Sequence, residues 1–120
     1  MKRAFLICPV RNATDDERAQ ILAFVRTLQG NGFVVHWPER DTDQVDSIGL
    51  RICTDNRRAI ADADIVYVWW NGTSSGSLFD LGIAFGLEKP VRIANVVTGT
   101  DGKSFSNVLI ALDAETARCE

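Results

Sequence analysis

The chain has 120 residues, of which 46% are hydrophobic and 24% are charged, a composition typical of one globular domain. Its net charge of −3 and its pI near 5.1 argue against a broad electrostatic contact with nucleic acid or with an anionic membrane, although a small anion can still be bound locally. Neither a membrane span nor a signal-peptide cleavage pattern is present, and three widely spaced cysteines indicate no disulfide framework and no metal site. We therefore predict a single cytoplasmic domain over residues 1–120, with no metal and no other cofactor.

The first half of the chain alternates apolar runs with amphipathic stretches. Residues 4–10 form a continuous apolar run, as in a strand covered on both faces. Thr14 then predicts the start of a helix, because Glu17 completes a capping box with it. A second strand is expected over residues 33–38, followed by a polar, acidic segment that is the best candidate for a mobile loop.

The second half continues the same alternation. A helix is predicted over residues 48–61, with Ile48, Ile52 and Ile60 on one stripe. The segments that follow are predicted as a strand, a helix and a strand, and they cover residues 64–70, 78–87 and 91–97. The "FSNVLIAL" segment fits either a short helix or a fifth strand, and the polar tail after it is expected to fray.

This order of elements predicts a three-layer α/β fold, with a parallel sheet of four to five strands and helices on both faces. In such sheets ligands bind beyond the carboxyl ends of the strands, near the point where the strand order reverses. The candidate site is therefore expected among residues 8–12, 37–46, 69–80 and 95–107.

The loop "NGTSSGS" offers backbone N–H groups, hydroxyls and glycines at the start of a helix. This combination can bind phosphate or sugar oxygens. It matches neither the Walker pattern nor G-x-G-x-x-G, and it fits equally a capped turn in which Ser75 or Ser77 satisfies the helix amides. Loop chemistry alone favours the capped turn.

Asp80 lies in the first turns of that helix, between Phe79 and Leu81. Gly82 and Gly86 predict a close approach of the helix to the sheet. An acid there can simply complement the helix dipole, but a partly desolvated carboxylate would have a perturbed pKa and could serve as a nucleophile or a base.

Three other side chains are candidates for the site. Asn56 shares a helical stripe with Ile52 and Ile60, so it should be buried and either tie backbone segments together or orient a ligand or acid. Arg11 follows the first strand and could hold a phosphate, and Trp70 could stack on a base. His36 and Cys8 are interpreted as strand residues rather than catalytic ones.

The segment "ADIVYVWW…GSLFDLGIAFGLEKP" resembles the nucleoside 2-deoxyribosyltransferase family, which includes relatives that hydrolyse deoxynucleoside monophosphates. The resemblance runs from about residue 4 to residue 109, and the positions that match the family pattern are Leu81, Gly82, Ala84, Lys89 and Pro90. It implies a flavodoxin-like (Rossmann-like) fold and a site in which a carboxylate attacks the anomeric carbon of a nucleoside or nucleotide as the base departs.

The resemblance also implies roles for individual residues. Asp80 falls on the nucleophile, Ser74 on a serine that contacts the 5′-phosphate, and Arg11 on a basic residue after the first strand. Ser106 falls on a late-loop residue that reaches a neighbouring subunit's site, which implies a homodimer or a larger assembly. The adjoining residues in the two loops complete the candidate substrate-binding set, namely Gly76, Ser77 and Asn107.

Two positions depart from the family pattern. Asp80 replaces a glutamate and is one methylene shorter, and Asn56 replaces an aspartate eight residues before Asp64. The neighbouring Asp55 could replace that carboxyl only if the helix changed register. The sequence therefore supports either an N-glycosidase or deoxyribosyltransferase, or a nucleotide-binding sensor that has lost turnover. An electron-transfer or response-regulator protein is a weaker alternative, because the phosphate-binding run and the phosphorylatable strand-end aspartate of those proteins are missing.

Overall fold

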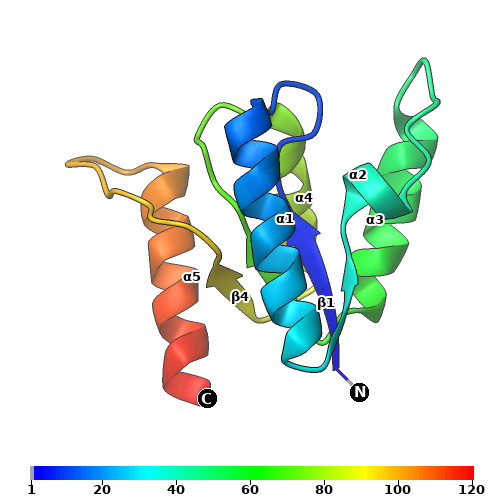
Figure 1. Cartoon of the computed structure of the whole chain (residues 1–120). Helices are drawn as coiled ribbons and strands as arrows, with labels where there is room; N and C mark the ends of the chain where they lie inside the picture. The colour runs from blue at the N-terminus through cyan, green and yellow to red at the C-terminus, as the bar shows by residue number, and fades with distance from the viewer. Residues whose placement is uncertain (1) are drawn as a thin grey trace.

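The computed structural model describes residues 2–120 and shows a parallel sheet with helices packed around it (Figure 1). The sheet has four strands in the order β2-β1-β3-β4. The strands are β1 (Lys2–Ile7), β2 (Phe33–His36), β3 (Ile65–Val68) and β4 (Val91–Ile93). The helices are α1 (Asp15–Gly30), α2 (Pro38–Asp41), α3 (Leu50–Asp62), α4 (Ser75–Gly86) and α5 (Phe105–Cys119). The predicted α/β fold with helices on both faces is confirmed.

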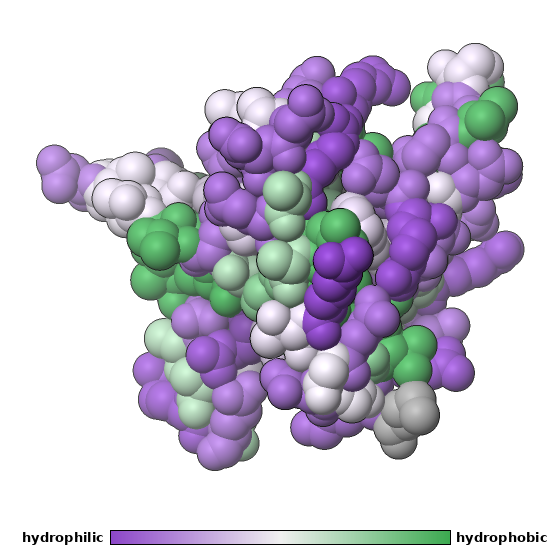
Figure 2. Space-filling view, in the orientation of Figure 1, coloured by the Kyte–Doolittle hydropathy of each residue, from purple (hydrophilic) through white to green (hydrophobic). Residues whose placement is uncertain are grey.

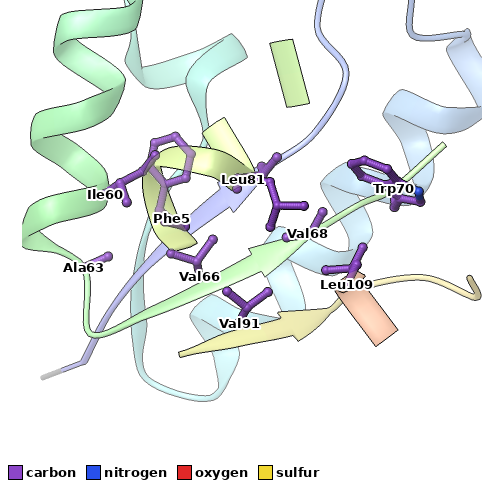
Figure 3. Packing of buried hydrophobic residues seen from close by; sticks show 11 residues of the cluster. Phe5, Ile60, Ala63, Val66, Val68, Trp70, Leu81, Val91 and Leu109 are labelled. Atoms are coloured by element: carbon purple, nitrogen blue, oxygen red, sulfur yellow. The ribbon is translucent and has the colours of Figure 1, made fainter. Parts of the chain in front are cut away.

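The core lies on both faces of the sheet. On one face, α1 packs Ile21, Val25 and Leu28 against alternate residues of β1 and β2. On the other face, α3 and α4 pack against β1, β3 and β4, and Figure 3 shows Ile60 and Leu81 directed into this second cluster. Because both faces are covered, the strands are nearly continuously apolar, as the sequence indicated.

The start of α1 is fixed by the predicted capping box. The Thr14 hydroxyl accepts from the Glu17 N–H at 3.1 Å, and the Glu17 carboxylate accepts from the Thr14 N–H at 3.2 Å. The two bonds satisfy two donors that a helix start otherwise leaves free, which sets where the chain turns back after β1.

The open question over the "FSNVLIAL" segment resolves in favour of a helix. Helix α5 lies beside β4, where a fifth strand would pair, and its side chains accept the edge N–H groups: Thr116 from Val91 at 3.0 Å and Asp113 from Ile93 at 2.8 Å. The helix continues to Cys119, so the prediction that the polar tail frays is wrong. These contacts cover the backbone donors of an edge strand.

Three details of the helices also differ from the sequence-based expectation. Helix α3 starts at Leu50 rather than at residue 48, and Ile48 is 89% exposed instead of lying on the buried stripe. The expected loop between β2 and α3 contains the short helix α2. Gly82 and Gly86 are exposed, with no neighbour within 4 Å of an added Cβ, so they do not mediate close packing on the sheet.

Within residues 2–120, no helix is both long enough and apolar enough to cross a bilayer.

Candidate active site

A cavity of about 480 Å³ lies beyond the carboxyl ends of β1 and β3. Since β2 and β3 lie on opposite sides of β1 in the sheet, this is the point where the strand order reverses and where such folds bind ligands. Three parts of the chain form its wall: the loop after β1, the α2–α3 segment with the first turns of α3, and the loop after β3 with the start of α4. The residues that line it include Cys8, Arg11, Asn12, Gln44, Ile48, Ile52, Asn56, Asn71, Ser74, Ser75, Gly76 and Asp80.

Asp80 is the buried acid of this cavity. It lies in the second turn of α4 and is 9% exposed, although its carboxyl group lines the cavity wall. Burial raises the pKa of Asp80 from 3.8 to about 7, and a hydrogen bond with the Asn56 side chain opposes that rise. A carboxyl group with such a pKa is ionised in a large fraction of molecules at neutral pH while poorly solvated, which makes it a candidate nucleophile or base.

Asn56 is held in position by a hydrogen bond from Thr42. The side chain comes from α3, is 5% exposed, and its Oδ1 accepts from the Thr42 hydroxyl at 2.8 Å. With Oδ1 occupied, the amide N–H group remains for Asp80. The predicted burial of Asn56 on one helical stripe with Ile60 is observed, and it places a buried amide in the cavity wall that contains Asp80.

The loop before α4 is a capped turn that also lines the cavity. The helix cap is Ser74, whose Oγ accepts from the Ser77 N–H at 3.1 Å, so the expectation that Ser75 or Ser77 provides the cap is wrong. Asn71 closes the turn by accepting from the N–H groups of Thr73 and Ser74 at 2.9 and 3.1 Å.

This turn leaves hydrogen-bond donors free at the cavity. Within residues 2–120, the backbone N–H groups of Ser75 and Gly76 donate to no other residue. The hydroxyl proton of Ser74 is likewise not used by the cap, because Oγ acts there as an acceptor. Together with the helix dipole, these groups favour an anion.

Arg11 is the only cationic residue among the described residues that line the cavity. It is exposed at the rim and forms no ion pair with any other residue in the range 2–120. A free guanidinium group in the same cavity wall as the start of α4 completes a set of donors that suits a phosphate group.

The remaining predicted residues lie outside this cavity. Trp70 packs in the core near Leu109 (Figure 3), and its indole N–H donates to the Ser106 hydroxyl at 3.0 Å. Asn107 braces the β4–α5 loop by accepting from the Thr100 N–H at 2.9 Å. Ser77 is a buried residue of the first turn of α4, and its Oγ has no hydrogen-bond partner within residues 2–120. The structure thus brings together Asp80 with the cavity residues of the predicted set, which are Arg11, Asn56, Ser74 and Gly76.

The sequence placed Thr42 and Cys8 within the segments expected to form the site but assigned neither of them a role there. Thr42 is buried, and only its contact with Asn56 reveals its place beside the cavity. Cys8 lines the cavity at the end of β1, and burial raises the pKa of its thiol to about 12, so it remains protonated and is a poor nucleophile at neutral pH. The strand-end position marked their segments, but the contacts of the two residues could not be predicted because they depend on packing between segments.

The fold is a parallel α/β domain with a cavity at the reversal of strand order, and solved structures share this fold. One is the CMP N-glycosidase BcmB of Clostridium botulinum, with a TM-score of 0.60, 19% sequence identity, and coverage of 92% of this chain and 82% of that one. Another is the 2-deoxyribosyltransferase of Bacillus psychrosaccharolyticus, with a TM-score of 0.65, 17% identity, and coverage of 92% and 95%.

At these identities the likeness establishes a common fold. Both neighbours bear the names of activities found in the family that the "ADIVYVWW…GSLFDLGIAFGLEKP" segment resembles, so the resemblance predicted from sequence is confirmed at the level of the fold. No protein-family model and no curated protein sequence matches the chain.

Proposed function

We propose that this protein acts on the N-glycosidic bond of a nucleoside or nucleotide, with Asp80 as the carboxylate nucleophile. The observation that carries the proposal is a buried carboxyl group, in contact with a buried amide, in the wall of the cavity where this fold binds ligands. Structural neighbours named as an N-glycosidase and a deoxyribosyltransferase give independent support.

The reaction then has two steps. A carboxylate oxygen of Asp80 forms a bond to the anomeric carbon as the C–N bond breaks, and the electron pair of that bond leaves with the base, which takes a proton from water. Water or the nitrogen of a second base next attacks the anomeric carbon, and the C–O bond to Asp80 breaks, which restores the carboxylate. The amide of Asn56 orients Asp80 and cannot itself supply the proton.

The distribution of polar and apolar groups favours a 5′-monophosphate as substrate. Arg11, Ser74 and the free N–H groups at the start of α4 are the donors in the cavity wall that would bind an anionic group. Ile48 and Ile52 give apolar surface on another part of the wall, which suits the flat face of a base.

We further propose a homo-oligomer. Helix α4 exposes Phe79 (57%) and Phe85 (61%) together with Gly82 and Gly86. Its outer surface therefore has two apolar rings and two positions without a side chain, where another helix could approach closely. Such a surface suits a second copy of the chain, and in that assembly Ser106 would serve the neighbouring subunit's site.

A second candidate function is a nucleotide sensor that binds without turnover. It is favoured by the side chains themselves: Asp80 is short for a nucleophile that must reach an anomeric carbon, and a misplacement of roughly 1 Å can cost about 10²-fold in rate. Asn56 in addition lacks the exchangeable proton of an acid.

One experiment separates the two candidates. The purified protein and its Asp80→Ala variant are incubated with a panel of nucleosides and 5′-monophosphates, free base is followed by chromatography, and thermal stabilisation is measured for each compound. Base release by the wild type but not by the variant supports the enzyme. Stabilisation by a monophosphate without base release supports the sensor. The absence of both base release and stabilisation refutes both candidate functions.

A further inference from the structure

A line of hydrogen bonds connects β2 with the buried amide of the site. His36, the last residue of β2, places Nε2 at 2.8 Å from Oγ1 of Thr42. The Thr42 hydroxyl in turn donates to Oδ1 of Asn56 at 2.8 Å. Thr42 and Asn56 are both 5% exposed, so the line runs through the interior, from the end of β2 past the end of α2 to α3.

The direction of this line follows from counting protons. A threonine hydroxyl carries one proton, and Thr42 gives it to Asn56, so Nε2 of His36 must carry the hydrogen of the other bond. Oδ1 of Asn56 is then occupied as an acceptor. Its amide nitrogen, which only donates, is left free in the cavity wall that Asn56 shares with Asp80, where donation from the Asn56 side chain lowers the pKa of that carboxyl group.

We propose that His36 and Thr42 are positioning residues, which hold the Asn56 amide with its N–H toward Asp80 and thereby favour the ionised nucleophile. This inference rests on the proposed function of the site. Neither residue touches the substrate, and both act through Asn56.

The two residues are suited to this role because they are held independently of Asn56. The His36 ring stacks on Phe5, with ring centroids 5.3 Å apart and an interplanar angle of 11°. The backbone of Thr42 is fixed at the end of α2, where its N–H donates to the Pro38 carbonyl at 3.0 Å. An asparagine amide without such a partner could turn over, since its oxygen and nitrogen occupy nearly the same space, and would then present oxygen to Asp80.

The charges around the line are consistent with a neutral His36. Burial lowers the pKa of His36, so at neutral pH the ring has one proton, which the geometry assigns to Nε2. The titratable groups that act on His36 are Asp41 and Arg40 from α2 and Asp55 from α3. The titratable groups that face Asp80 are the Cys8 thiol at the end of β1, whose pKa the Asp80 charge raises, and Arg11, which lines the same cavity.

The test is a direct titration of the Asp80 carboxyl carbon by NMR in 13C-aspartate-labelled protein, with Asp80→Asn to assign the signal. The test variant is Thr42→Val, which preserves shape and removes the hydroxyl, and the matched control is Thr42→Ser, which keeps the hydroxyl. His36→Phe is a second test variant that keeps the stacking on Phe5 and loses the donor.

The proposal predicts that the midpoint of Asp80 rises by about one pH unit in Thr42→Val, because a freed amide no longer donates to the carboxylate and can accept from its protonated form. Thr42→Ser should titrate as the wild type does, and His36→Phe should shift in the same direction by a smaller amount. An unchanged midpoint in Thr42→Val and His36→Phe, or an equal shift in Thr42→Ser, overturns the proposal. If Thr42→Val does not fold, the comparison of His36→Phe with wild type decides.

The titration needs no turnover, so it separates this inference from the proposed function. If the wild type releases no base, the proposed enzyme fails while the titration still shows whether His36 and Thr42 act on Asp80. If base is released, the acid limb of the rate profile should move with the titration midpoint in Thr42→Val, and a limb that stays in place contradicts the positioning role.

Discussion

Replacing Asp80 by asparagine should stabilise the fold, and by an amount that grows with pH. An acid whose pKa is raised on folding keeps its proton up to a higher pH in the folded state than in the unfolded chain. Between the two pKa values, the unfolded state therefore loses its proton first, and stability falls as the pH rises. For Asp80, with an ordinary pKa of 3.8 and a folded pKa of about 7, the penalty reaches about 4 kcal/mol above pH 8 and is only about 1 kcal/mol near pH 4.5.

Asp80→Asn removes this penalty and preserves the shape and most of the hydrogen bonding of the side chain. We expect the variant to have a higher free energy of unfolding than the wild type at both pH values. The difference between the two proteins should be about 3 kcal/mol larger near pH 8.5 than near pH 4.5. In a chain of this size this corresponds to a difference in melting temperature of the order of 10 °C. Urea unfolding of both proteins at the two pH values measures it, and other titrating groups cancel in the comparison. A gap between the proteins that does not change with pH would show that Asp80 titrates normally and would refute the argument from burial.

Three further predictions concern activity, binding and assembly. If Asp80 must be ionised to attack, the rate of base release should rise with pH through an acid limb centred near pH 7, and a flat profile between about pH 5 and pH 9 would contradict this. Arg11→Ala should weaken the binding of a 5′-monophosphate by roughly tenfold or more, as measured by calorimetry, and leave the corresponding nucleoside unaffected. Arg26→Ala on the exposed part of α1 is the control, and equal loss in both variants would exclude a specific phosphate contact. Phe85→Lys should convert the proposed oligomer to monomer in light scattering while Gln20→Lys on α1 does not, and a wild type that is already monomeric would remove the basis for an assembly through α4.

The features that could be predicted from sequence are those whose cause is local. The reciprocal bonds of Thr14 and Glu17 need residues only three positions apart, and the burial of Asn56 follows from its helical spacing to Ile60. The burial of Asp80 follows from its apolar neighbours and from its place after a buried strand.

The features that could not be predicted depend on contacts between distant segments. Thr42 reaches Asn56 only because the short helix α2 turns the chain after β2, and no spacing rule links two residues fourteen positions apart. Trp70 lies directly before the cavity loop, yet its bond to Ser106 directs the ring into the core. The identity of α5 was also open, since the short apolar run in "FSNVLIAL" fits both a strand and a helix, and the contacts with the edge of β4 that decide it are not visible in the sequence.

The most direct test of the central claim is to look for the sugar on Asp80. The wild type is mixed with the best substrate from the panel, quenched in acid during turnover, and analysed by intact mass and by fragmentation of the peptide that contains residues 71–86, with Asp80→Asn in parallel. We predict a glycosyl adduct on Asp80 in the wild type, and neither adduct nor base release in the variant. Base release by Asp80→Asn at the rate of the wild type, or an adduct on another side chain, would contradict Asp80 as the nucleophile.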